Sequence, residues 1–146
     1  MSITKFAALA AGVALIAVAC TDFEAPDPVV LPDVIVENPS FERDIQPIFT
    51  ARCATASCHN LATQQVGLNL QEGYAYDEIV GEDSPSSHEL ASVQPFDADN
   101  SWLVRRIQAD PARRFFLERM PLGRAPLTDN QIATIINWVN AGALRN

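Results

Sequence analysis

Two cysteines and a histidine lie close together in the stretch Cys53-Ala-Thr-Ala-Ser-Cys58-His59. A pair of thiols followed directly by a histidine is typical of covalent haem attachment, although the usual motif has two residues between the cysteines rather than four. Each thiol can add across a haem vinyl group, and the adjacent His59 can then give a ring nitrogen to the iron. A haem held in this way supplies much of the core, so this motif constrains the fold more than any other feature.

Two other interpretations of the same residues stay open. Cys53 and Cys58 could form a disulfide that closes a small loop, with His59 uninvolved. The three residues could also bind zinc, but a tetrahedral site needs a fourth ligand. His88 is the only other histidine in the chain, and there is no second cysteine pair.

Residues 1–19 predict a signal peptide and therefore an exported protein. Lys5 is the only charged residue among the first twenty-one, and an apolar run follows from residue 6 to residue 19. A charged start followed by a short apolar run is typical of secretory signals. The run is shorter than the roughly 20 residues that a membrane-spanning helix needs, so an uncleaved anchor helix is the weaker alternative.

The apolar run ends in Ala17-Val18-Ala19-Cys20, which resembles the lipobox of bacterial lipoproteins. The resemblance implies lipidation of Cys20 after cleavage and an anchor at the periplasmic face of the envelope or the cell surface. Thr21 stands where inner-membrane lipoproteins have Asp, which implies the outer membrane. An ordinary signal peptide cut near Ala19 is the alternative.

The number of cysteines agrees with this combination. In an exported protein with three cysteines, a single disulfide leaves one thiol unpaired. If Cys20 carries lipid and Cys53 and Cys58 carry haem, none is left over. An oxidising compartment outside the cytoplasm is also where c-type haem is attached.

The charge of the mature chain excludes one large class of partner. From Cys20 onward 127 residues remain, which suits one domain and a tail. Nine arginines face eighteen acidic residues, a formal charge of −9. Such a chain is poorly suited to binding nucleic acid. We expect redox partner proteins of the envelope with basic docking patches, and a membrane contact through the lipid anchor.

Residues 20–40 are predicted to be a lipidated cysteine and a linker, and residues 41–146 to be the folded domain. The linker contains four prolines and five acidic residues after Cys20 and no basic residue. Proline and like charge favour an extended chain. The alternative is that Val29-Val30-Leu31 and Val34-Ile35-Val36 pack on the domain as strand-like segments.

The domain is predicted to be all-α with long irregular loops. A first helix is expected from Phe41 to Phe49, with Ser40 as its N-cap and Pro47 either kinking it or marking its regular start. Residues 61–99 are expected to be mostly irregular, with one helical turn at 74–80. A second helix is expected from near Ser101 until Pro111 stops it.

The last helix carries the clearest signals. Thr128-Asp129-Asn130-Gln131 is a capping box, and Gly142 is a natural C-terminal stop. Its apolar stripe consists of Ile132, Ile135, Ile136 and Val139.

Met120 is the second candidate for chemistry. It lies in Arg119-Met120-Pro121-Leu122-Gly123 and is the only methionine left once Met1 leaves with the signal peptide. A thioether is a soft ligand suited to haem iron opposite a histidine, whereas most methionines only fill gaps in a core. His88 could replace Met120, but its polar surroundings favour a solvated loop histidine.

A series of short segments completes the pattern between residues 41 and 143: Asp44–Phe49, Cys53–His59, Gly67–Leu70, Asn100–Val104, Arg119–Gly123, Leu127–Gln131 and Trp138–Ala143. In this order they resemble class I mono-haem cytochromes c, and more narrowly the cytochrome c-like domains of secreted bacterial proteins with a C-x4-C-H motif. The resemblance implies a helical domain wrapped around one covalent haem c. It also implies axial ligation by His59 and Met120 and electron transfer.

With both axial positions filled there is no open site for a substrate, so we expect an electron carrier rather than an enzyme. A haem domain of a larger redox complex, a peroxidase-like protein and a non-redox envelope lipoprotein with a Cys53–Cys58 disulfide are the alternatives. Six arginines are grouped late in the chain, and we expect at least one that flanks Met120 to contact a haem propionate. Others could form a basic docking rim around the exposed haem edge, and a solvated helix face that balances an acidic domain is the alternative. The six arginines are Arg105, Arg106, Arg113, Arg114, Arg119 and Arg124.

Overall fold

The computed structural model describes residues 31, 33–87, 89–108 and 119–146. In this part of the chain the regular structure is helical, and β pairing is limited to two isolated bridges, Val80 with Val93 and Asp83 with Ala91. The all-α class predicted from the sequence is therefore confirmed. The helical elements are η1 (Phe41–Ile45), α1 (Gln46–Arg52), η2 (Gln65–Gly67), α2 (Ala75–Ile79), α3 (Trp102–Ile107) and α4 (Asp129–Asn140).

The first predicted helix is divided at Gln46. Residues Phe41–Ile45 form a π-helical turn, and regular α-helix begins only with α1. Pro47 lies in the first turn of α1, where its missing N–H is not needed. Of the two roles predicted for Pro47, marking the regular start is therefore the correct one.

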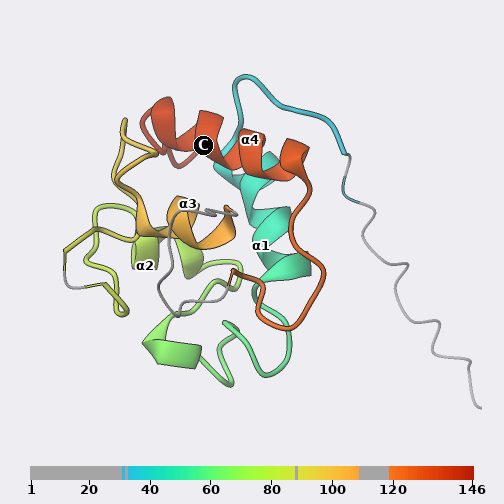
Figure 1. The fold of residues 1–146 in the computed structure, drawn as a ribbon, viewed down its shortest axis with the longest axis vertical. Coiled ribbons are helices and arrows are strands. Elements are labelled where there is room, and N and C mark those ends of the chain that lie inside the picture. Colours follow the sequence, from blue (N-terminus) through green and yellow to red (C-terminus); the bar gives the residue numbers. More distant parts are fainter. Residues whose placement is uncertain (1–30, 32, 88, 109–118) are drawn as a thin grey trace, which may run out of the picture.

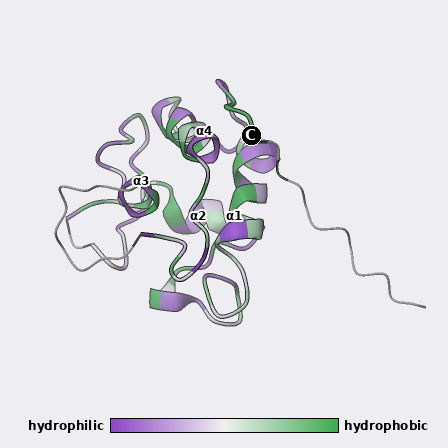
Figure 2. Cartoon of the chain, turned by 45° about the vertical axis from the view of Figure 1, so that its right-hand side comes forward, coloured by the Kyte–Doolittle hydropathy of each residue, from purple (hydrophilic) through white to green (hydrophobic). Residues whose placement is uncertain are grey.

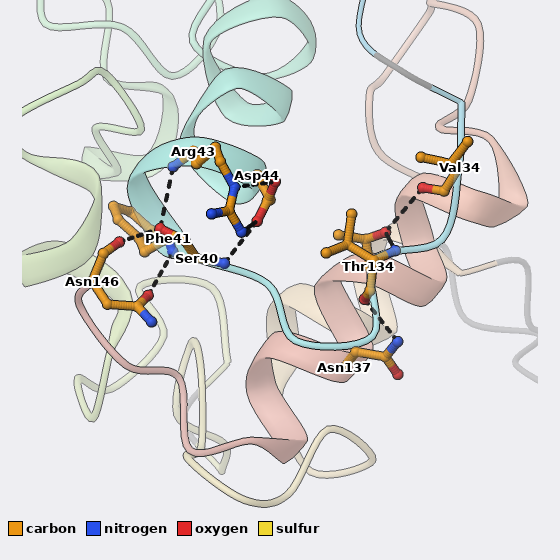
Figure 3. Close-up of polar contacts among 9 residues, drawn as sticks. Val34, Ser40, Phe41, Arg43, Asp44, Thr134, Asn137 and Asn146 are labelled. Atoms are coloured by element: carbon orange, nitrogen blue, oxygen red, sulfur yellow. Dashed lines mark hydrogen bonds and ion pairs between the residues drawn. The ribbon is translucent and has the colours of Figure 1, made fainter.

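The start of η1 is held by the far end of the chain. The backbone N–H of Phe41 donates to Oδ1 of Asn146 at 3.0 Å (Figure 3). The N–H of Glu42 donates to the Asn146 carbonyl at 3.1 Å. Ser40 Oγ also donates to that carbonyl, and it accepts from the N–H of Arg43 at 3.4 Å. Free N–H groups at a helix start need such partners. Ser40 is the N-cap of η1, as predicted from the sequence.

Helix α4 begins and ends as predicted. Thr128 Oγ1 accepts from the N–H of Gln131 at 3.2 Å, and Gln131 Oε1 accepts from the N–H of Thr128 at 3.1 Å. After the helix Gly142 has a φ of +103°, and a Cβ at this position would lie 2.6 Å from the ring of Phe96. Conformation and space therefore both favour glycine.

The core joins the two ends of the domain. The ring of Phe41 lies 5.3 Å from Trp138 on α4 and 5.1 Å from Tyr76 on α2, centroid to centroid. Tyr76 also donates its hydroxyl to the carbonyl of Ala143 at 2.9 Å. Figure 1 shows α4 lying beside η1 and the start of α1. Figure 2 shows that the helices carry hydrophilic as well as hydrophobic positions, as surface helices do.

The described end of the predicted linker lies on the domain. Val36 donates its N–H to Oγ1 of Thr134 at 3.1 Å, and its carbonyl accepts from the side chain of Asn137 at 3.0 Å (Figure 3). Thr128 also donates to the carboxylate of Asp33 at 2.7 Å. Residues 33–36 are therefore a strap along α4 that is held by hydrogen bonds, while the side chains of Val34 and Ile35 are 58% and 49% exposed.

The long middle region is irregular, as expected. Helix α2 falls within the predicted turn at 74–80, and α3 begins directly after Ser101. The Ser101 hydroxyl is buried and donates to the carbonyl of Asp97 at 2.8 Å. Helix α3 ends at Ile107, ahead of the predicted stop at Pro111, which lies outside the described residues.

The predicted signal peptide, Cys20 and most of the predicted linker also lie outside the described residues. Among the helices that the structure describes, none is long and apolar enough to cross a membrane.

Candidate functional site

The end of α1 leads directly into the attachment motif. The N–H groups of Cys53 and Ala54 both donate to the carbonyl of Phe49, at 2.8 and 2.7 Å, which ends the helix. The chain then turns back, and the N–H of His59 donates to the Cys53 carbonyl at 3.1 Å. Ser57 has a φ of +67° in this turn. A compact loop therefore accommodates the four residues between the two thiols.

The two thiols lie in different environments. Cys53 is buried in the hydrophobic core, whereas Cys58 is partly exposed. Both are free cysteines, so the disulfide considered from the sequence is not formed in this structure. Burial raises the pKa of the Cys53 thiol to about 12, with Arg52 acting in the opposite direction and Cys58 adding to the rise. Cys53 is therefore held as a neutral thiol facing the core.

His59 is held from its backbone and is half-buried. Its carbonyl accepts from the N–H of Leu70 at 2.7 Å, which fixes the loop against the segment after η2. Burial lowers the pKa of the His59 side chain, and the Arg106 guanidinium adds to this, while the carbonyls of Leu68 and Gln65 oppose it. The imidazole is therefore kept neutral, which is the form that binds a metal.

Several buried polar atoms around this motif lack a protein partner. In the described part of the chain, the buried side-chain nitrogen and oxygen atoms without a hydrogen bond all lie between residues 46 and 69: Gln46 Oε1, Thr55 Oγ1, His59 Nδ1 and Asn69 Nδ2. Such atoms are costly to leave unpaired, and two of them, Thr55 Oγ1 and His59 Nδ1, belong to the attachment motif itself. The residues present therefore fit a bound group at this place.

Met120 is positioned by the end of α3. Its N–H donates to the carbonyl of Arg106 at 2.8 Å. The neighbouring Arg119 donates from Nε to the Ile107 carbonyl at 2.7 Å and from Nη2 to the Leu127 carbonyl at 3.5 Å. The Met120 side chain is partly buried and packs against the core. The methionine loop is therefore tied to α3 at one side and to the start of α4 at the other.

Arg106 is the residue of α3 that holds the backbone of Met120. Its carbonyl accepts from the N–H of Met120 at 2.8 Å, and its positive charge makes a small contribution to the lowered pKa of His59. The guanidinium also lies over the ring of Trp102, 5.9 Å from the centroid. The bond to Arg106 involves the backbone of Met120, and no hydrogen bond joins the described residues Met120 and His59.

The remaining residues predicted to take part are the other arginines and His88. Arg105 and Arg119 donate to groups of the protein itself, namely the carbonyls of Asp99 and Ile107. Arg124 is exposed and makes no hydrogen bond through its side chain to a described residue. His88, Arg113 and Arg114 lie outside the described residues.

A zinc site is not assembled in the described part of the chain. No group of three His, Cys, Asp or Glu side chains there is arranged to hold a metal ion. The Cys53, Cys58 and His59 side chains thus do not converge on a tetrahedral centre.

The sequence reasoning missed Arg52. Its Nη2 donates to the carbonyls of Ala125 at 2.7 Å and Pro126 at 3.0 Å, which joins the end of α1 to the loop after Met120. The only signal in the sequence was its place directly before Cys53, which does not predict a contact with residues 125–126.

No family model, curated protein or solved structure matches this chain.

Proposed function

We propose that this chain is an electron-transfer protein with one covalent haem c. Cys53 and Cys58 would form the thioether bonds, and His59 and Met120 would be the axial ligands. The mature protein would be exported and anchored to the bacterial envelope through lipid on Cys20. A cytochrome c-like wrap of the helices around the cofactor is part of the proposal.

One observation carries the proposal. Cys53 and Cys58 are free thiols on one compact loop, which leads directly to a half-buried His59 whose pKa is lowered by burial. The unpaired buried Nδ1 of His59 supports the same interpretation. An axial histidine uses one ring nitrogen for the metal and donates a hydrogen bond with the other.

Each residue of the site would have a defined task. Cys53 would fix the cofactor to the core, and Cys58 would fix it to the outer part of the loop. His59 stays neutral because burial disfavours its charged form, so its nitrogen lone pair is available. The bond from Met120 N–H to Arg106 would hold the thioether in place.

When bound, the haem iron supplies one-electron chemistry between its ferrous and ferric states. The surrounding protein would set the reduction potential through the methionine ligand, burial and nearby charge. The positive charge of Arg106 near His59 would favour the reduced state, because it opposes the extra positive charge of oxidised iron.

The test is covalent haem content after expression with a c-type maturation system. We expect the intact mass to retain a haem after denaturation, the reduced protein to show a visible α band, and the oxidised protein a weak near-infrared methionine–iron band. A Cys20→Ser variant is the matched control, since it should lose the lipid and keep the haem.

The other outcomes separate the alternatives. Covalent haem without the near-infrared band would favour ligation by His88 if no added ligand binds, and a peroxidase-like protein with an open position if one does. A chain without haem mass, in which Cys53 and Cys58 are oxidised to each other, would be a non-redox lipoprotein and would contradict the proposal.

A further inference from the structure

A pocket of about 280 Å³ lies between the end of α1 and the turn that follows Met120. Its walls are formed by Ala51, Arg52, Pro121, Arg124 and Ala125. One wall ends directly before Cys53 and the other begins directly after Met120. The pocket therefore lies beside the residues proposed to hold the cofactor.

Two arginines line this pocket without any acidic residue. Arg52 is oriented by its Nη2 bonds to the carbonyls of Ala125 and Pro126, which leave Nη1 and Nε without a hydrogen bond to a described residue. Arg124 is exposed, and its N–H donates to the Pro121 carbonyl at 3.4 Å, which closes the turn. Both guanidinium groups therefore have donors available.

The charge at this place is unusual for the molecule. The chain has a formal net charge of −8, and Arg43 and Arg145 pair with Asp44 and Asp77 at 2.8 and 2.7 Å. In the part of the chain that the structure describes, no carboxylate pairs with Arg52 or Arg124. Two like charges around one pocket repel each other, and a bound carboxylate would remove that cost while accepting two parallel hydrogen bonds.

We propose that this pocket binds an Asp or Glu side chain of the protein that exchanges electrons with this one. The identification of the occupant as a redox partner rests on the proposed function, whereas the carboxylate site itself does not. Leu122, in the same turn, is 52% exposed and offers an apolar contact next to the charged one. An apolar centre with charged surroundings is common in protein interfaces.

The site can be tested with a hexaglutamate peptide as the probe. We expect the Nε–H signals of Arg52 and Arg124 in an NMR titration of the full protein to shift and saturate, while that of Arg145 stays in place. Arg124→Gln should abolish the saturable shift, and Arg124→Lys should weaken it, because lysine cannot form the bidentate contact. Arg52→Lys is the second variant. It is preferred to Arg52→Gln because it keeps the positive charge, whereas Arg52→Gln would remove both the charge and the bonds that hold the loop at residues 125–126.

The docking role has a separate readout in the reduced holoprotein. We expect Arg124→Gln to slow oxidation by hexacyanoferrate(III) by on the order of threefold at low salt. Oxidation by a cationic tris(phenanthroline)cobalt(III) complex should be unchanged or faster, and Arg145→Gln should affect neither rate.

The two readouts keep the two proposals distinguishable. Equal shifts at all arginines, or unchanged peptide binding in Arg124→Gln, would overturn the carboxylate site. The carboxylate site would also be overturned if bound haem already occupies the pocket, so that the Arg52 and Arg124 signals do not respond to the peptide. If the protein proves to contain no haem but still binds the peptide saturably, the carboxylate site is supported. Its assignment to a redox partner is then overturned.

Discussion

At the scale of single residues, Met120 determines how the proposed cofactor site would behave. Replacing Met120 by His would exchange a soft thioether for a stronger donor to ferric iron. We expect the reduction potential to fall by on the order of 0.1 V or more, as measured by spectroelectrochemical titration. Leu122→Ala, two residues away and exposed, should leave the potential unchanged. An equal effect of both substitutions would contradict the role of Met120 as a ligand.

The two thiols should differ in reactivity when no haem is bound. The Cys53 pKa is raised by burial from 9.0 to about 12, so at pH 8 it would have about a thousandth of its ordinary thiolate fraction. Since the thiolate is the nucleophile, we expect iodoacetamide to label the partly exposed Cys58 well before Cys53, as followed by peptide mass spectrometry. In denaturant both should react at similar rates. Similar rates without denaturant would contradict the buried position of Cys53.

At the scale of elements, Thr128 has two functions at the start of α4. It caps the helix through Gln131, and its hydroxyl donates to Asp33 on the strap. We expect Thr128→Ala to lower the free energy of unfolding by about 1–2 kcal/mol in a urea titration. Thr63→Ala is the control, because Thr63 is exposed and its hydroxyl bonds to no described residue. A loss below about 0.5 kcal/mol for Thr128→Ala would show that cap and strap contribute little.

The elements also show how far local signals reach. The capping box at Thr128 and the stop at Gly142 were predictable, because each depends on residues within one turn. The position of Pro47 was predictable as one of two outcomes, since its missing N–H suits a helix start. The strap was not, because its hydrogen bonds join residues 33–36 to a helix about a hundred residues later.

At the scale of the whole molecule, the contact of η1 with α4 holds the domain together. Phe41 is 5% exposed and packs between Trp138 and Tyr76. We expect Phe41→Ala to cost about 3–5 kcal/mol of unfolding free energy, measured by circular dichroism during denaturation.

Phe96 provides a matched control for this prediction. It is 74% exposed, so Phe96→Ala should cost about 1 kcal/mol or less. A comparable loss in both variants would indicate that the aromatic cluster around Phe41 is not the centre of stability.

By itself, the sequence determined the all-α class, the helix starts at Ser40 and Thr128, and the candidates Cys53, Cys58, His59 and Met120. These follow from residue types and short spacings, which act within a few residues along the chain. Only the tertiary structure decided that Met120 is bonded to Arg106 of α3, and that Arg52 and Arg124 line one pocket. Such contacts depend on how distant segments pack, and no local pattern records which partner a buried carbonyl or guanidinium meets.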